Sequence, residues 1–328
     1  MLGSLGVGGP TVDTVLDPGP AAPGSSLTGQ VHLKGGSTDF TVEHITLELV
    51  ARVETESFDH GEGEGEGVVV FDRFTVAEGI RLAAGEQRAV PFGVPLPWET
   101  PVTELYGQAL GIVLGVRTEM AVAGAKDKGD LDPLTVRPLP VQEAVLEAFG
   151  QLGFGFRSAD LEYGRIGGTG QQLPFYQEIE LIPAERYAHR MNEIEVTFLA
   201  APGGMDVVLE ADRRGGPLSS GYDAITRFTV PYAGVAGTDW NAVVDRWVGE
   251  LADRYPSHGT PLPHGHGDPY GGHGDHGHDG HHRSGPGMGT VVAAGAAGLA
   301  VGVVGGMVAA EVVDEVGEYF EGDGEDEG

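Results

Sequence analysis

Apolar and polar residues alternate along much of the chain. Residues 42–54 read VEHITLELVARVE, in which every second position from Ile45 to Val53 is apolar. A period of two places the apolar side chains on one face and predicts a half-buried β-strand. The same pattern predicts further strands within residues 23–36, 88–97, 111–125, 171–183, 192–204, 205–216 and 228–234. Prolines in the 88–97 segment favour an edge strand, because proline cannot donate a ladder hydrogen bond.

One segment near the C-terminal end has a helical period instead. In residues 239–255 (DWNAVVDRWVGELADRY) apolar residues recur three and four positions apart, with Asp239 as the predicted N-cap. A stripe that contains Trp240 and Trp247 is typical of a helix that packs on a core. A shorter helical stretch is expected in QEAVLEAFGQLG, which follows RPLP at residues 137–140.

Many short strands with Gly- and Pro-rich turns predict an all-β protein built from antiparallel β-sandwiches. The number of strands exceeds what one small sandwich holds, so we expect two sandwiches in tandem, then a C-terminal helix and a flexible tail. The expected divisions are a sandwich at 1–138, a second at 139–256 closed by the 239–255 helix, a His/Gly-rich linker at 257–287, and an apolar segment with an acidic tail at 288–328.

Charge and composition narrow the function. The 328 residues carry a formal net charge of −30, which argues against a nucleic-acid partner and against electrostatic docking on an anionic membrane. The absence of cysteine excludes disulfides, thiolate metal ligands and a cysteine nucleophile, and fits a cytoplasmic protein. The first residues have no basic segment followed by an apolar run, so we expect no signal peptide.

The usual catalytic motifs are missing. The sequence contains no G-x-S-x-G, no G-x-x-x-x-G-K-[ST] and no H-E-x-x-H, and we expect no enzyme activity and no catalytic residues. GEGEGEG at residues 61–67 alternates glycine with glutamate, which would repel a phosphate, so a solvated hairpin loop is expected, with weak Ca²⁺ binding as the alternative. Arg213 and Arg214 form a basic doublet that is either a surface pair beside a turn or a source of ion pairs at the domain interface.

Eight of the 12 histidines lie between residues 258 and 282. They are His258, His264, His266, His273, His276, His278, His281 and His282. Imidazole suits Zn, Ni and Cu, but a structural site needs fixed ligands, and the intervening glycines leave the chain flexible. Three interpretations stay open: weak Zn or Ni binding, a solvated linker with no metal role, or a pH response in which the histidines become charged below their usual pKa of about 6.5. We expect no other cofactor.

Residues 288–310 carry no charge over a length that can cross a bilayer. Gly298, Gly302 and Gly306 are four residues apart, so on a helix they share a face that permits close helix–helix approach. Glycine and alanine add little transfer free energy, however, which makes insertion marginal. Membrane association, self-association into a homo-oligomer or docking on a partner, and disorder all stay open for this segment.

Several motifs in order carry a family resemblance. PGSSLTGQVHLKGG (23–36) followed by ITLELVARVE (45–54) resembles the opening of an arrestin-like domain. With LPFYQEIELIP (173–183), EIEVTFLAAPGGMDVVLEADRRGG (193–216) and WNAVVDRWVGEL (240–251), residues 1–255 resemble the bacterial sporulation-control proteins. The His-rich linker and Ala/Gly-rich end resemble the actinobacterial members of that family.

The resemblance implies two tandem arrestin-like sandwiches, a cytoplasmic location and no catalysis. It further implies a scaffold or regulator that binds other proteins in sporulation, developmental or stress control. Affinity is then expected to come from sheet edges and from the groove between domains. The alternatives are an adaptor tethered to a membrane by its apolar tail, and a metal or pH sensor that responds through the histidine-rich segment.

Overall fold

The computed structural model describes residues 8–56, 64–124, 127–213 and 224–253. Strands make up most of these residues, and the described ranges contain two α-helices. The predicted all-β class is therefore confirmed. The histidine-rich linker and the apolar tail lie outside the described residues, so the expectations for both stay predictions.

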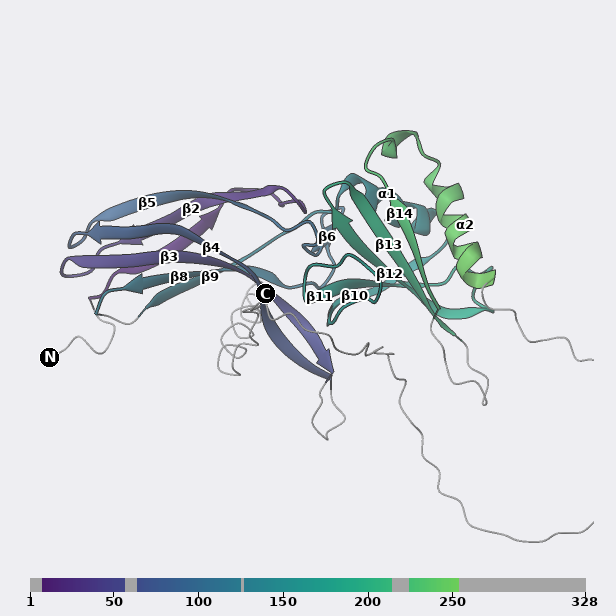
Figure 1. Cartoon of the computed structure of the whole chain (residues 1–328), viewed down its shortest axis with the longest axis horizontal. Helices are drawn as coiled ribbons and strands as arrows, with labels where there is room; N and C mark the ends of the chain where they lie inside the picture. Colours follow the sequence, from purple (N-terminus) through teal and green to yellow (C-terminus); the bar gives the residue numbers. More distant parts are fainter. Residues whose placement is uncertain (1–7, 57–63, 125–126, 214–223, 254–328) are drawn as a thin grey trace, which may run out of the picture.

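The first half of the chain is a sandwich of two sheets, seen as two layers in Figure 1. The smaller sheet has the order β1–β2–β5 and consists of β1 (Thr11–Leu16), β2 (Ser26–Lys34) and β5 (Gln87–Pro95). The larger layer has the order β4–β3–β8–β9 and consists of β3 (Phe40–Glu56), β4 (Glu64–Leu82), β8 (Leu114–Val122) and β9 (Lys128–Pro133). A short hairpin, β6 (Glu104–Leu105) and β7 (Gln108–Ala109), follows the smaller sheet.

Alternation in the sequence explains how this sandwich closes. In β3 the residues Ile45, Leu47 and Leu49 are completely buried between the two layers. Burial of such side chains stabilises a fold by about 25 cal/mol per Å² of apolar surface removed from water. β5 lies at the edge of its sheet, as its prolines predict.

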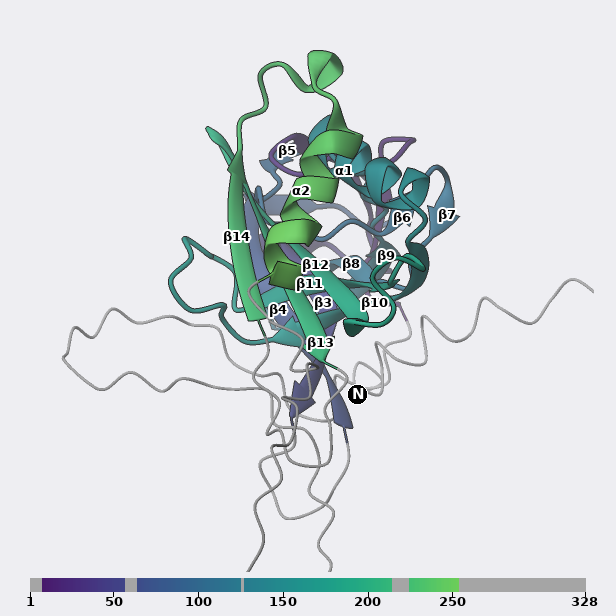
Figure 2. The ribbon, with the colours of Figure 1, turned by 90° about the vertical axis from the view of Figure 1, so that its right-hand side faces the viewer.

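The second half has one sheet with helices on a single side. Its strands are β10 (Gly155–Tyr163), β11 (Phe175–Ile182), β12 (Met191–Ala201), β13 (Gly204–Arg213) and β14 (Ala224–Val230), hydrogen-bonded in that order. The helical elements are α1 (Pro140–Gln151), the 3₁₀ helix η1 (Val235–Gly237) and α2 (Trp240–Asp253). Both α-helices lie on the same face of the sheet (Figures 1 and 2). Among the described residues, helices and not a second sheet therefore supply the layer that covers this face.

One parallel contact joins the larger sheet of the first half to the sheet of the second half. β10 pairs with β3 where Glu162 lies opposite Glu54, beyond the residues of β3 that pair with β8. The described strands thus form a nine-stranded sheet that continues through both halves. The predicted domain boundary falls just before α1, but Leu173 and Phe175 pack in the core of the first half. The boundary at residue 138 stays a prediction.

Two expected elements differ in detail. β4 begins at Glu64, so the last four residues of the GEGEGEG segment belong to a strand, while residues 57–63 lie outside the described part. The alternation did not predict β10, because its sequence GFRSADLEY places polar residues at most positions. This strand is specified by its neighbours in the sheet rather than by its own apolar face.

Residues 98–102 hold the two halves together. The Trp98 ring stacks on Tyr232 with ring centroids 5.6 Å apart, and a Cβ on Gly24 would lie 2.5 Å from that ring. The side-chain amide of Gln177 accepts a hydrogen bond from the Val102 N–H at 2.9 Å and donates to its carbonyl oxygen at 2.8 Å. These contacts connect the segment after β5 to the sheet of the second half.

The side chain of Glu99 forms further contacts between the two halves. Its carboxylate accepts hydrogen bonds from the backbone N–H groups of Gln172 and Leu173 at 2.7–2.9 Å. The loop it binds is itself ordered by Gln171, whose side chain donates to the carbonyl oxygens of Gly164 and Leu173 at 2.8 and 2.9 Å. The halves are therefore joined by specific polar contacts as well as by packing.

Candidate functional site

The strand β14 is an open edge of the long sheet. It pairs with β13 on one side, and no other described strand pairs with it. Its Ile225 side chain is 51% exposed. An unpaired edge presents backbone N–H and C=O groups that another chain can use, so it is a candidate for binding an extended segment.

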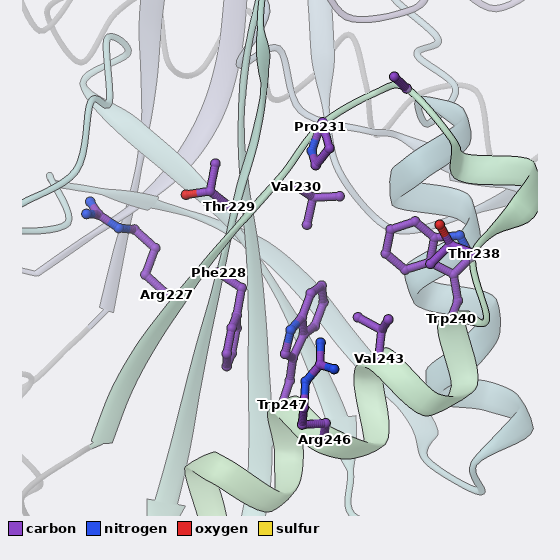
Figure 3. A pocket seen from close by; sticks show the side chains of 11 residues that line it. Arg227, Phe228, Thr229, Val230, Pro231, Thr238, Trp240, Val243, Arg246 and Trp247 are labelled. Carbon is purple, nitrogen blue, oxygen red and sulfur yellow. The ribbon is translucent and has the colours of Figure 1, made fainter.

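A groove lies beside this edge, between β14 and α2 (Figure 3). Its volume is about 480 Å³. Phe228 of β14 stacks on Trp247 of α2 with centroids 4.7 Å apart, and Trp240 meets Trp247 edge to face at 6.4 Å. The Trp240 indole N–H donates to the carbonyl oxygen of Val235 at 2.9 Å, which fixes the ring. The groove is therefore walled by oriented aromatic rings.

The local sequence of α2 explains this arrangement. Residues Trp240, Val243 and Trp247 are spaced three and four apart, so they share one helix face. The predicted N-cap is confirmed, since the Asp239 carboxylate accepts a hydrogen bond from the Ala242 N–H at 3.1 Å. Trp247 is buried in the core as expected, whereas Trp240 and Val243 are partly exposed and line the groove.

The charged residues that line the groove are both arginines. Arg246 lies beside Trp247, and its Nε is 3.9 Å from Glu250. Arg227 points away from Phe228 in Figure 3, donates to the Gly168 carbonyl oxygen and lies 3.9 Å from Asp206. Each arginine has an acidic neighbour outside the lining, but the charged groups of the lining itself are basic. That charge favours an acidic ligand.

The sheet face opposite the helices has the reverse charge. Asp160 and Glu162 of β10 and Glu178 of β11 each offer a carboxylate oxygen within 4.8 Å of the others. Burial raises the pKa of Glu178 to about 9, with further increases from Glu195 and Asp160. Burial also raises the pKa of Asp160 to about 6, and Glu54 and Glu180 add to that increase.

Such a trio has two chemical uses. Its oxygens are the ligands that Ca²⁺, Mg²⁺ or Mn²⁺ prefers. Without a cation, the group keeps a proton on Glu178 near neutral pH, which removes part of the repulsion. One atom of the trio, Asp160 Oδ1, is buried and has no hydrogen-bond partner among the described residues.

The first half also buries a carboxylate, but with arginines around it. Glu48 of β3 lies opposite Arg73 of β4 and Arg117 of β8 in the strand register. Arg117 Nε donates to Glu48 Oε2 at 2.7 Å, and Arg73 forms an ion pair with Oε1. The Glu48 side chain is 1% exposed. This cluster is a structural ion network within the sheet.

The residues that sequence reasoning selected are mostly outside the described part. This applies to the histidines from His258 to His282, to the glycines Gly298, Gly302 and Gly306, and to Arg214. Arg213 is the last residue of β13 and lies opposite Met191. Weak metal binding, membrane or self-association, and the interface ion pairs of Arg213 and Arg214 therefore stay predictions.

Sequence reasoning did not select the groove or the acidic face. A signal for the acidic face was present, since the polar positions of several strands are acidic, as in DLEY, QEIELI and EIEV. Period two places those acids on one face. The groove had no such signal, because Phe228 and Trp247 are 19 positions apart and meet only through tertiary packing.

The first half is a sandwich of two sheets, and the second half is one sheet covered by helices. This architecture is an arrestin-like fold with a C-terminal helix. Residues 1–215 match the family model described as SpoOM protein, and the chain belongs to this sporulation-control family.

A relative and a solved structure support this assignment. The chain is 34% identical over 212 residues to the sporulation-control protein spo0M of Bacillus subtilis (strain 168). This match covers 64% of the chain and 78% of the relative. It is also similar to the crystal structure of Spo0M, sporulation control protein, from Bacillus subtilis. That match has a TM-score of 0.64 and 28% identity, and it covers 76% of this chain and 100% of that chain.

Helices in the part of the chain that the structure describes do not reach the length and apolar character needed to cross a membrane. Residues 288–310 are not among those described.

Proposed function

We propose that this chain is a non-catalytic regulator in sporulation or developmental control that acts by binding other proteins. The relative's name supports the regulatory role. The observation that carries the binding mode is the open edge of β14 beside an aromatic groove. The partner contributes an extended segment that adds to β14.

The chemistry of the groove specifies the segment. Backbone hydrogen bonds to β14 supply affinity that does not depend on side chains, and pockets beside the edge select alternate side chains. The rings of Trp240 and Trp247 favour an aromatic or large apolar side chain. Arg246 faces the groove while its acidic neighbour Glu250 lies outside the lining, so it favours an acidic residue of the partner beside it. The segment is therefore extended, apolar and acidic.

A groove variant in the native host tests this proposal. Val243→Arg places a long charged side chain in the groove from a position that is already partly exposed. We expect fewer spores than the wild type, with the same amount of folded protein by circular dichroism and thermal unfolding. The matched control is Val15→Arg, at a 50% exposed position on β1 in the other half. Normal spore numbers with a folded Val243→Arg protein would contradict the proposal.

Crosslinking gives an independent physical measurement. A photoreactive residue in place of Ile225 reports proteins that touch the open edge of β14. A crosslinked partner should disappear from the Val243→Arg background and persist in the Val15→Arg background. A partner that is still crosslinked in both the Val243→Arg and the Val15→Arg proteins does not use the groove.

A further inference from the structure

A second cavity lies where the two halves meet. Its volume is about 380 Å³, and its walls come from the β6–β7 hairpin, from α1 and from β10 and β11. Most of the wall is apolar, including Leu105, Leu146, Phe149 and Leu181. This cavity is separate from the groove beside β14, since no residue lines both.

Two aromatic side chains at this cavity are exposed. Tyr106 at the hairpin tip is 62% exposed, and Phe156 of β10 is 50% exposed. Tyr106 has φ +53°, the one positive φ at a non-glycine position in the described chain, and Gly107 follows with φ +76°. Two left-handed residues in succession match a tight hairpin turn, but a tyrosine there costs free energy. The hairpin therefore presents a tyrosine where a small residue would fold more easily.

The charged residue in the described lining of the cavity is acidic. Glu147 is the only charged residue in the described lining, and Glu143 lies one helical turn before it. Burial raises the pKa of the Tyr106 phenol, and the nearby charges of Glu147 and Glu143 add to that increase. The cavity is apolar inside and acidic at its rim.

We propose that this cavity binds a large apolar side chain from a cationic amphipathic segment of a partner protein. A volume of about 380 Å³ is at the small end for ligand pockets, which span roughly 300–1,000 Å³, so it suits a single side-chain anchor. Apolar anchors in desolvated pockets carry much of the binding energy at interfaces, and complementary charges around them add specificity and speed association. Lysine or arginine beside the anchor would lie near Glu143 and Glu147.

This surface goes beyond the proposed function. The groove beside β14 is basic and fits an acidic extended segment, whereas the junction cavity is acidic and fits a cationic one. A regulator with both surfaces can hold two different partners at once. Variants in one surface leave the other unchanged, so either proposal can fail alone.

Gly150 gives a sharp test. It lies in α1, lines the cavity, and a Cβ built on it meets no atom within 4 Å. Gly150→Phe therefore adds a ring at the cavity wall without a clash at its Cβ. Gly249→Phe is the matched control, because Gly249 lies within α2, has equally open space and lines neither cavity.

The probe is a synthetic amphipathic helix of lysine, leucine and tryptophan, with a second peptide in which glutamate replaces every lysine. Because the chain has no cysteine, Gln108→Cys on exposed β7 supplies a single site for a fluorophore near the cavity. Fluorescence anisotropy of the full chain then measures affinity at two salt concentrations.

We expect the cationic peptide to bind the labelled chain and the Gly249→Phe control alike. Gly150→Phe should weaken binding at least about 10-fold, and Glu147→Lys several-fold with a smaller salt dependence. Equal binding to the Gly150→Phe and control proteins would overturn the proposal, as would preference for the acidic peptide or no binding. Light scattering is the second measurement: a dimer that Gly150→Phe dissociates would show a second copy in the cavity, and it would also overturn the proposal.

Discussion

Two carboxylates, the buried Glu48 in the first half and the half-buried Glu178 in the second, are stabilised in opposite ways. Glu48 lies between Arg73 and Arg117, which are its partners on the two neighbouring strands. Glu178 lies among other carboxylates, and burial with those neighbours raises its pKa to about 9. Arginines compensate the charge of Glu48, whereas Glu178 loses its charge by keeping the proton.

This difference has a consequence for how each half responds to its surroundings. Arginine side chains are always charged in proteins, so the opposite charges beside Glu48 are a permanent feature of the first half. A cluster of carboxylates with raised pKa values changes charge in that range and can exchange protons for a cation. The Glu48 network is therefore expected to act as a constant part of the scaffold, and the acidic face as a responsive region. Four experiments test or sharpen this contrast.

Removal of the Glu48 carboxylate should have the largest effect. Glu48→Ala leaves Arg117 partly buried beside Arg73 without the acid between them, so we expect the free energy of unfolding to fall by about 3 kcal/mol. Urea denaturation followed by circular dichroism measures it. Glu250→Ala, which breaks the exposed pair with Arg246 on α2, is the control and should be nearly neutral. Similar stability losses in both variants would show that the Glu48 network is not special.

Loss of the Trp98 ring should separate the halves. Trp98→Ala removes the stacking on Tyr232 and the cover over Gly24, and we expect a loss of about 2 kcal/mol. Calorimetry should show a broadened transition, because the two halves lose a shared contact. Tyr163→Ala, at an exposed aromatic residue, is the comparison and should change little. An unchanged melting temperature for Trp98→Ala would mean that this stack does not couple the halves.

The Glu178 cluster should make stability depend on pH. The folded chain holds a proton on Glu178 from its ordinary pKa of 4.5 up to about 9, whereas the unfolded chain releases it near 4.5. Stability therefore falls as pH rises through this window, by about 1–2 kcal/mol between roughly pH 7 and pH 9. Thermal unfolding across this range measures the slope.

Glu178→Gln is the matched variant, because glutamine keeps the shape and cannot ionise. It should be more stable than the wild type near pH 9 and should have a flatter profile there. A slope should persist at lower pH, since burial raises the pKa of Asp132 to about 7 and that of Asp160 to about 6. A wild-type profile that rises with pH would contradict the sign.

The smallest effect is expected at the amide clamp. Gln177→Ala removes two hydrogen bonds to the backbone of Val102, and we expect a loss of about 1 kcal/mol. Hydrogen exchange at the Val102 amide should accelerate, which is a local measurement of the junction. Gln172→Ala, at an exposed position nearby, is the control and should leave that amide protected.

Much of the fold could be predicted from local pattern. The strand at 42–54, the edge strand at 88–97 and the helix at 239–255 correspond to β3, β5 and α2, with ends that differ by a few residues. β10 could not be predicted in this way, because polar residues occupy most of its positions. The candidate site was predicted poorly, since Phe228 and Trp247 become neighbours only when α2 packs on β14.

The sequence alone determined which residues share a face, because the periods of strands and helices are local properties of a few successive residues. That includes the acids that alternate with apolar residues in β11 and β12. Only the tertiary structure decided that Glu48 meets two arginines while Glu178 meets other acids. The partners come from different strands, and their register depends on long-range pairing. The same holds for the parallel contact of β3 with β10, which joins residues 54 and 162 and makes one sheet of two halves.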